Sequence, residues 1–282
     1  MLSFFPVMAE STKKLFDPAM EHNRLSRFAR KLGKDTCDLM IENCVESFNA
    51  RECLIHSDSH VFNILVERKP DINTLEQFGP VGKYVLCDWE MSMAGPLGRD
   101  IGLTHAFPIA CIIAHAFNGH TGVSYCILDV LELLWSEYAS ALKAEGQKDE
   151  DCLRKTYRAC IGWIGHFLYG VYYELGVHLE FLPLEDNVIS AESVKESLGY
   201  LGLQFMRIGF GEYEVDASLD SLRSMFRAAI EEEVEHKLAV TKPRRNRRSS
   251  MLRVSGRRVS DAALFASFTS KMHVACLAKV EG

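Results

Sequence analysis

Apolar residues recur at helical spacing along most of the chain, and the alternation typical of strands is confined to one short stretch. After position 100, apolar residues repeat every three or four positions, which predicts a series of amphipathic helices. The third of these helices is apolar nearly all round, so we expect it to be buried at the centre of the domain. The predicted helices span about 101–117, 123–145, 151–176, 191–206 and 217–238.

The first hundred positions combine helical segments with one predicted hairpin. Residues 8–32 are expected to be helical or irregular, and Asp35 is placed to cap a helix that runs to about Phe48. Two apolar runs, 62–67 and 83–87, flank a polar loop that contains Pro, Gly and Asn, and they predict a β-hairpin. The expected fold class is therefore α+β and mainly helical.

Charge is distributed unevenly, and its distribution divides the chain into a body and a tail. Residues 242–258 hold eight Lys or Arg and no acid, and residues 259–282 are balanced, so a net charge of −6 leaves −14 on the rest. The basic, serine-rich stretch cannot bury enough apolar surface to fold alone. The sequence therefore predicts one domain over 1–240, a disordered linker over 241–260 and a tail over 261–282 in which a short helix can form.

The basic linker also has a regulatory interpretation. Arginine-rich patterns around Ser249, Ser250 and Ser260 suit basophilic protein kinases, whose phosphates would cancel positive charge. Nucleic acid is not an expected partner, because the body is acidic and the basic stretch has no interleaved aromatic residues. The sequence leaves the oligomeric state open, a dimer included.

Cysteine usage and the apolar runs indicate a cytoplasmic protein. Nine Cys form an odd set without a CxxC pair, which argues against a disulfide framework and favours a reducing compartment. Four of them lie in apolar helical patterns and are expected to be small core residues: Cys44, Cys111, Cys126 and Cys160. No membrane association is expected, because the longest apolar run, 106–114, is far shorter than the roughly 20 residues of a membrane span.

One stretch near the predicted hairpin carries side chains suited to catalysis. Residues 54–66 read LIHSDSHVFNILV and place Asp58 in a polar turn between His56 and His60. Asn63 follows at the start of the first strand. A short polar loop of this kind can direct one carboxylate at a hydroxyl group.

The second stretch supplies further acidic residues. Residues 84–102 read YVLCDWEMSMAGPLGRDIG, an apolar run that ends in Asp88-Trp89-Glu90, followed by a Gly-Pro turn and Asp100. The hairpin brings the start of one strand and the end of the other to the same edge, so we expect Asn63 and Asp88 to lie close together. Phosphoryl transfer needs such oxygen ligands for a divalent cation, beside a group that orients the nucleophile. Alternatively, Asp58 only caps a turn and Asp88 only ends a strand.

In this order, the two stretches resemble the catalytic loop and metal-binding segment of the protein-kinase-like small-molecule kinases. This superfamily includes aminoglycoside phosphotransferases, choline kinases and methylthioribose kinases. Its pattern reads roughly H-G-D-x-H-x-x-N-I, then an apolar strand ending in D-x-E, then G-P/D-x-x-x-D, and Ser57 stands where the pattern has Gly. The matching residues are His56, Asp58, His60, Asn63, Ile64, Asp88, Glu90, Gly95, Pro96 and Asp100.

The resemblance is closest to methylthioribose kinases and extends over about 16–233. The segments that carry it are FDP at 16–18, EHNR at 21–24, GPLGRDIG at 95–102, similar to G-P-M-G-F-D-I-G, and FMRIG at 205–209. Two positions depart from those kinases. Ile208 stands beside Arg207, where their sugar site has a second Arg, and Asn63 stands where they often carry Ser.

The resemblance implies an ATP-dependent phosphotransferase with Mg²⁺ as a second cofactor and a small-molecule alcohol as acceptor, first of all a methylthioribose-like sugar. Asp58 would be the catalytic residue, which orients the hydroxyl and accepts its proton. Asn63, Asp88 and Glu90 would hold the magnesium, and the first two would also contact the nucleotide. His56, His60 and Asp100 would support the loop, with Asp100 accepting hydrogen bonds from its backbone, and Arg207 is a candidate for substrate contact.

Upstream of Asp58, the chain lacks the features with which such kinases cover the nucleotide. Gly33 is the only Gly before Gly79, so no glycine-rich loop is present, and no Walker-type GxxxxGK[ST] occurs. The lysines before the loop stand in helical or loop contexts rather than on a predicted strand. The resemblance therefore covers the larger, C-terminal lobe, and the alternative function is an inactive lobe that acts as a binding module.

Overall fold

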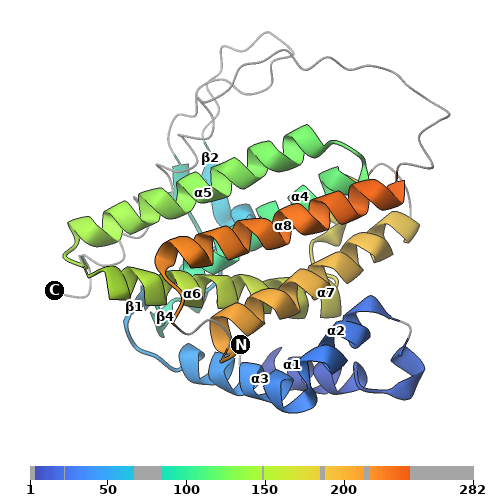
Figure 1. Cartoon of the computed structure of the whole chain (residues 1–282). Helices are drawn as coiled ribbons and strands as arrows, with labels where there is room; N and C mark the ends of the chain where they lie inside the picture. Colours follow the sequence, from blue (N-terminus) through green and yellow to red (C-terminus); the bar gives the residue numbers. More distant parts are fainter. Residues whose placement is uncertain are drawn as a thin grey trace, which may run out of the picture.

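The structure, a computed structural model, describes residues 4–21, 23–66, 84–147, 149–184, 188–212 and 216–241. Helices make up most of this part of the chain and its strands are short, so the predicted mainly helical class is confirmed (Figure 1). The helices are α1 (Phe4–Lys14), α2 (Arg24–Leu32), α3 (Lys34–Phe48), α4 (Arg99–Phe117), α5 (Thr121–Ala144), α6 (Glu150–His166), α7 (Val188–Phe210) and α8 (Leu219–Thr241). The strands are β1 (Cys53–Ile55), β2 (Ile64–Val66), β3 (Tyr84–Leu86) and β4 (Met93–Gly95).

The five helices expected after position 100 are all present, and the third changes type along its length. Helix α6 ends at His166 and continues as a π-helix, η4, over Phe167–Glu174. Short 3₁₀ turns lie at Pro18–Met20 (η1), Val61–Asn63 (η2), Trp89–Met91 (η3) and Leu179–Phe181 (η5). Because π-helices are rare and occur frequently at functional sites, η4 is a structural landmark that helical periodicity alone did not predict.

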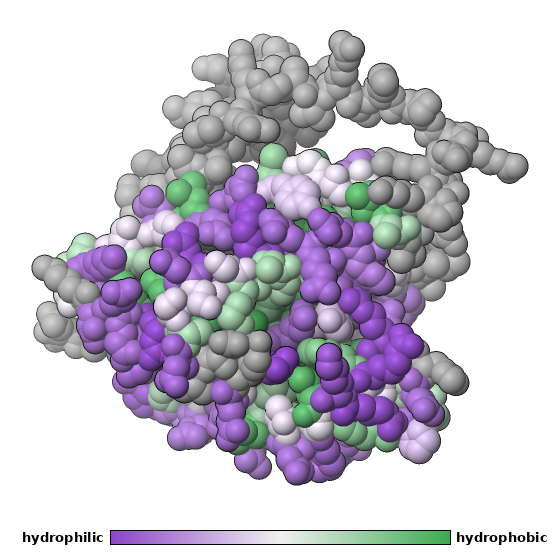
Figure 2. Space-filling model, viewed as in Figure 1, coloured by the Kyte–Doolittle hydropathy of each residue, from purple (hydrophilic) through white to green (hydrophobic). Residues whose placement is uncertain are grey.

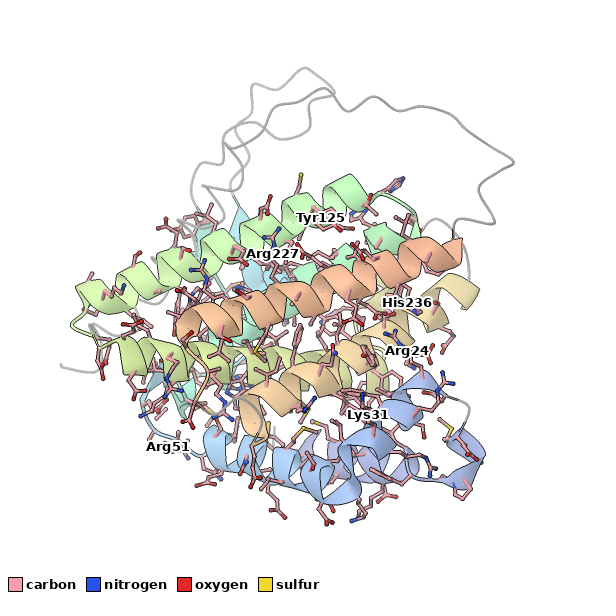
Figure 3. All side chains as sticks on the ribbon, viewed as in Figure 1. Arg24, Lys31, Arg51, Tyr125, Arg227 and His236 are labelled. Atoms are coloured by element: carbon pink, nitrogen blue, oxygen red, sulfur yellow. The ribbon has the colours of Figure 1, made fainter. Side chains whose placement is uncertain are left out.

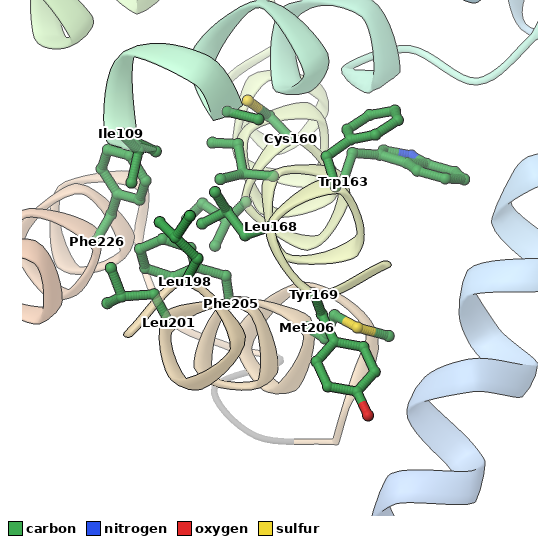
Figure 4. Packing of buried hydrophobic residues seen from close by; sticks show 14 of the residues in the cluster. Ile109, Cys160, Trp163, Leu168, Tyr169, Leu198, Leu201, Phe205, Met206 and Phe226 are labelled. Atoms are coloured by element: carbon green, nitrogen blue, oxygen red, sulfur yellow. The ribbon is translucent and has the colours of Figure 1, made fainter. Parts of the chain in front are cut away.

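Glycines let α6 and α7 approach each other closely at the centre of the body. A β-carbon at Gly209 would lie only 2.2 Å from the Cα of Gly162, so neither position has room for a side chain. Large buried side chains pack around this pair and against α4 and α8, including Trp163, Leu168 and Phe205 (Figure 4). The expectation that the segment 151–176 is buried at the centre is therefore confirmed for most of its length.

The N-terminal helices α1–α3 lie together along one side of the helical body (Figure 1). Arg24, at the start of α2, donates two hydrogen bonds to the Glu233 carboxylate of α8, at 2.8 and 2.7 Å. Asp17 and Asn23 accept hydrogen bonds from backbone N–H groups and cap η1 and α2. Asp17, Asn23 and Arg24 belong to two of the segments that carry the resemblance. In this structure each of them has a structural role.

Two sequence-based expectations about helices and cysteines are wrong. Helix α3 already begins at Lys34 after Gly33, whose φ is +91°, and no side chain caps it, so Asp35 lies in the first turn rather than at the cap. Cys126 is exposed, because it lies on the solvent side of the surface helix α5. Cys44 and Cys160 are fully buried as expected, and Cys111 is partly buried.

Two pairs of antiparallel strands frame the polar loop at positions 56–60. Strands β2 and β3 pair in the register Ile64↔Leu86, which confirms the predicted hairpin, although the strands are shorter than expected and residues 67–83 lie outside the described part. Strand β1 pairs with β4, a second pair that the apolar pattern did not predict. Both pairs hold the loop against the N-terminus of α4.

The face that carries α5, α7 and α8 is mostly hydrophilic, and its hydrophobic residues form small separate groups (Figure 2). Helix α4 is long and apolar enough to cross a membrane by length and composition, yet 72% of its apolar window is buried in the fold, as in the core helix of a globular domain. The predicted linker and tail lie outside the described residues from position 242 onward, and Ser249, Ser250 and Ser260 lie there with them.

Candidate active site

Asp100 ties the polar loop to the first turn of α4. Its Oδ2 accepts a hydrogen bond from the backbone N–H of His56 at 2.6 Å, and its Oδ1 accepts one from the N–H of Ser57 at 3.0 Å. The Ser59 hydroxyl donates to the Asp100 carbonyl at 2.8 Å. Asp100 is buried. The predicted hydrogen bonding of Asp100 to the loop backbone is therefore present.

Ser57 adopts a backbone conformation that normally requires glycine. Its φ is +73°, in the left-handed region, which costs a residue with a β-carbon free energy. The motif that this loop resembles has Gly at this position, and glycine adopts this φ without strain. Arg99 offsets the strain, because its Nη1 donates to the Ser57 carbonyl at 2.7 Å and to the Ser57 hydroxyl at 3.0 Å.

His56 braces the loop with both ring nitrogens. Its Nε2 lies 2.8 Å from the carbonyl oxygen of Cys87 and must donate to it, while its Nδ1 accepts from the Asp58 N–H at 3.2 Å. This pattern fixes a neutral ring with the proton on Nε2. The side chain is fully buried and packs on the Trp89 ring at 4.6 Å. His56 therefore supports the loop, as expected, and has no nitrogen available for proton transfer to a ligand.

Asp58 presents its carboxylate at the surface of the loop, with 37% of its side chain exposed. The Nε2 atom of His60 lies 3.5 Å from its Oδ2, and the Asn63 amide donates to the same oxygen at 3.2 Å. The hydrogen bond from His60 and, to a lesser degree, that from Asn63 lower the pKa of Asp58 below its usual value, against partial burial. Asp58 is therefore an ionised acceptor at neutral pH.

Asn63 and Asp88 lie at one edge of the β2–β3 hairpin, and Glu90 follows Asp88 in the 3₁₀ turn η3. The Cys87 N–H donates to the Asn63 carbonyl at 2.9 Å, which brings the neighbouring Asp88 to that edge, as predicted. The Asn63 amide also donates to the Asp58 carbonyl at 2.8 Å. Asp88 has a left-handed φ of +66° and is exposed, as is Glu90 in η3.

The oxygen atoms at this edge fit a nucleotide-bound magnesium ion better than a self-contained metal centre. Within the described ranges, no group of three or more His, Cys, Asp or Glu side chains is arranged to hold a metal. Two carboxylates and one amide oxygen are instead hard ligands of the number that Mg²⁺ uses when waters and substrate phosphates complete its shell. The donor chemistry of Asn63, Asp88 and Glu90 is thus compatible with the predicted cofactor.

A pocket of about 360 Å³ opens beside Asp58. Its walls come from the loop, η3, the first turns of α4, the end of α6 and the π-helix η4. Asp58 and Glu90 contribute carboxylates to it, and Arg99 contributes a guanidinium that is only 3% exposed. A small ligand in this pocket would have a hydroxyl group within reach of Asp58.

Arg207 does not line the pocket beside Asp58. It lines a separate pocket of about 390 Å³ together with Lys31 and Glu212. The sequence-based assignment of Arg207 to substrate contact is therefore not supported by its position. The segment 205–209 owes its pattern to packing, because Phe205 and Met206 are buried and Gly209 abuts α6.

Three pocket residues were missed by the sequence interpretation: Arg99, His166 and His178. His178 has a left-handed φ of +62°, and its ring lies 5.3 Å from the ring of His60. His166 is buried, and burial, with the nearby charge of Arg99, lowers its pKa to about 3. The sequence did contain a signal for Arg99. In the segment GPLGRDIG a charged Arg replaces the apolar Phe of the pattern G-P-M-G-F-D-I-G.

Comparison of the chain with protein-family models, with curated proteins and with solved structures found no match. The functional conclusion therefore depends on the residues and their geometry.

Proposed function

We propose that this chain is the larger, helical lobe of a kinase-like phosphotransferase, which transfers the γ-phosphoryl group of ATP to a hydroxyl of a small molecule. The observation that supports it most is the Asp58 loop. Its backbone is held by Asp100 and His56, its carboxylate is ionised, and it borders a pocket of the size of a small ligand. Transfer of a phosphoryl group requires positioning of this kind more than covalent chemistry.

In this mechanism, Asp58 accepts a hydrogen bond from the acceptor hydroxyl, aligns its oxygen with the γ-phosphorus, and takes the proton late in the transfer. Asn63 and His60 keep the carboxylate oriented. Asn63, Asp88 and Glu90 would hold magnesium, which when bound neutralises charge on the phosphates. Asp100 and His56 act as positioning residues, because they touch the loop and not the reacting atoms.

An exposed apolar surface beside the metal-binding edge supports a nucleotide site. Leu65 and Val85 are directly paired across the hairpin and are 59% and 58% exposed. Exposed apolar residues that adjoin each other can form part of a binding surface. A nucleotide whose phosphates approach Asn63 and Asp88 would lay its base over this pair.

Magnesium with ATP is expected to raise the melting temperature of the full chain. At a hundredfold excess over Kd, the shift should be about 5 °C or more, since binding to the native state alone stabilises it. Asp88→Ala should abolish the shift, because it removes an oxygen ligand at the hairpin edge. Differential scanning fluorimetry measures it. Asp35→Ala serves as the control, since Asp35 is an exposed acid on α3, and equal shifts in all three proteins would contradict the metal site.

A second candidate, a non-catalytic binding module, is favoured by one observation. In the described residues before the loop, the chain forms the helices α1–α3 and only the short strand β1, so no strand there carries a lysine that could clamp phosphates. An uncovered site would also admit water, which weakens electrostatic contacts.

The two candidates predict different results for the full chain on its own. We expect the purified chain to fold and to turn over ATP poorly, because the described residues supply no clamp for the phosphates. Transfer of ³²P from ATP to methylthioribose, to aminoglycosides and to amino alcohols measures this. Turnover near 10 s⁻¹, about the median for enzymes, would show that the N-terminal 55 residues or a second chain supply the phosphate contacts. No transfer under any condition, together with no magnesium-dependent shift, would favour the binding module.

A further inference from the structure

Exposed apolar side chains adjoin the mouth of the pocket beside Asp58 and form one patch. The ring centre of Phe62 lies 4.9 Å from that of Phe181 and 4.7 Å from that of His178. Phe62, Val177 and Phe181 are all exposed, and Phe181 is 57% exposed. Contiguous apolar surface, unlike single exposed apolar residues, commonly marks an interaction site. We call the patch of Phe62, Val177, His178 and Phe181 the aromatic rim.

The aromatic rim is part of the folded body and borders the pocket directly. Phe62 packs edge-on against Phe107 of α4, with the ring centres 4.9 Å apart. Val177 and His178 also line the pocket beside Asp58. Whatever binds to the aromatic rim therefore covers part of the pocket mouth.

The chain leaves helix α8 at the end of the body to which the rim segment is attached. Lys237, in the last turns of α8, donates from its Nζ to the Ser193 hydroxyl in the first turns of α7, at 3.1 Å. The end of α8 and the start of α7 accordingly lie side by side (Figure 1). The Asn118 amide, at the end of α4, donates to the carbonyl of Pro183, which follows Phe181 by two positions. The segment after Thr241 therefore starts close to the part of the chain that carries the rim.

The sequence after the basic linker has an apolar face suited to such a patch. Apolar residues in 261–278 recur every three or four positions, which predicts an amphipathic helix with two phenylalanines on one side. Ser267 and Ser270 fall on the opposite side of that helix. This segment lies outside the described residues. The residues of its apolar face are Leu264, Phe265, Phe268, Met272 and Cys276.

The linker is long enough to bring this segment to the rim. The positions 242–260 span about 25 Å as a flexible coil and about 65 Å when fully extended. A tether of this length gives the segment an effective concentration in the range of about 1 mM at nearby surfaces. A weak apolar contact within the chain is then well populated, whereas a separate partner has to supply all of its affinity by contacts.

Charge favours the same route. Residues 242–258 hold eight Lys or Arg and no acid. Exposed acids lie on the elements between the end of α8 and the rim: Glu232 and Glu235 on α8, Glu192 on α7 and Glu180 next to Phe181. Each exposed ion pair contributes little, so the apolar face determines where the segment binds and the linker charge favours the approach.

We propose that residues 261–278 dock on the aromatic rim of the same chain as an amphipathic helix and cover the mouth of the pocket beside Asp58. Phe265 and Phe268 would pack against Phe62 and Phe181, in the manner of a helix that binds an apolar groove. A ligand then reaches Asp58 only after the segment has left the rim. The docking does not depend on the proposed phosphoryl transfer, because it uses the surface around the pocket and none of the reacting groups.

Photo-cross-linking in the full chain tests the docking. p-Benzoylphenylalanine in place of Phe181 should cross-link to a peptide within 261–278, which mass spectrometry identifies after digestion. The same residue in place of Val123 is the matched control, since Val123 is exposed in the first turn of α5 and lies outside the rim. The yield of cross-links to 261–278 should be about tenfold higher from position 181 than from position 123. Equal yields from the two positions, or none from position 181, would overturn the docking.

Two double variants test which face of the segment binds. Phe265→Asp with Phe268→Asp should lower the yield from position 181 about tenfold or more, because it places charges against the apolar rim. Ser267→Asp with Ser270→Asp adds the same charge on the opposite face and should change the yield less than about twofold. Equal losses in both double variants would contradict docking through the apolar face.

A mixture of ¹⁵N-labelled and unlabelled chains shows whether the segment belongs to the same chain. Cross-linked peptide pairs from position 181 should carry one label throughout. Pairs that combine the two labels would assign the rim to a second copy of the chain and would overturn docking within one chain.

Discussion

In a protein that joins this chain to a nucleotide-covering lobe, replacement of Asp58 by asparagine is expected to lower kcat for phosphoryl transfer about a hundredfold or more and to leave the affinity for ATP nearly unchanged. Asparagine keeps the size of the side chain and can still contact His60 and the Asn63 amide. It cannot take a proton from the acceptor hydroxyl. Because the lowered pKa keeps Asp58 ionised at neutral pH, the wild type already has its acceptor in the active state.

Initial rates measured over ranges of ATP and acceptor concentration separate the two parameters. Asp35→Asn is the matched control, since Asp35 is an exposed Asp on α3 whose amide substitution leaves the loop untouched. Melting temperatures of the three proteins show whether the loop is intact. Wild-type turnover in Asp58→Asn would reduce Asp58 to a turn residue and would remove the main support for the proposed reaction.

The largest expected loss of stability follows from Arg24→Ala. Glu233 is 1% exposed, and Arg24 satisfies its carboxylate with two hydrogen bonds, packs over the Tyr200 ring at 3.8 Å, and links α2 to α8 (Figure 3). Removing Arg24 leaves the buried Glu233 carboxylate without the partner that gives it two hydrogen bonds. We therefore expect the free energy of unfolding to fall by about 3 kcal/mol.

Arg227 provides the control on the same helix, α8. Its guanidinium hydrogen-bonds Asp129 and Glu231 and lies 3.9 Å from Glu132, but its side chain is 35% exposed, so Arg227→Ala should cost less than about 1 kcal/mol (Figure 3). Urea unfolding at pH 7 measures both variants. Equal losses in the two variants would mean that burial of Glu233 does not determine the strength of the pair.

The same pair predicts a dependence on pH. Burial raises the pKa of Glu233, but the hydrogen bonds from Arg24 and Ser197 and the charges of Arg24 and Lys237 outweigh it, so the net shift is downward. A lowered folded pKa stabilises the fold above the ordinary value of 4.5 for Glu, and this contribution is lost as the pH falls through the lowered pKa. Acid unfolding of Arg24→Ala should accordingly show a weaker dependence on pH in this range.

The sequence was most informative where one local rule decides the structure. Apolar periodicity located all five helices after position 100, and strand alternation located the hairpin with Asn63 and Asp88 at one edge. The bracing role of Asp100 followed from the motif. In each case the deciding residues are close in sequence or belong to one pattern.

The rest depends on contacts between distant segments. Periodicity could not show that the chain after His166 widens into a π-helix, nor that Arg99 lies within a cage of rings from α3, α6 and η4. The residues around Arg207 do not show whether its helix segment packs in the core or contacts a substrate. Its assignment therefore came from the resemblance alone, and its position away from the pocket beside Asp58 does not support it. The cap of α3 was misplaced because Asp35 and Gly33 both suit a helix start.

The pairing of Arg24 with Glu233 has a consequence for how the chain is made. These residues are 209 positions apart, and the contacts of Ser11 with Tyr169 and of Asn43 with Phe210 span 158 and 167 positions. At roughly 5–20 residues per second, the ribosome needs about 10–40 s to synthesise the partner of Arg24. The apolar side chains of Met8 and Leu25, which lie beside Gly170 of η4 and Gly199 of α7, stay exposed until those two helices have been made. We therefore expect nascent chains that stop before α7 to depend on chaperones, whereas chains extended past α7 should need them less.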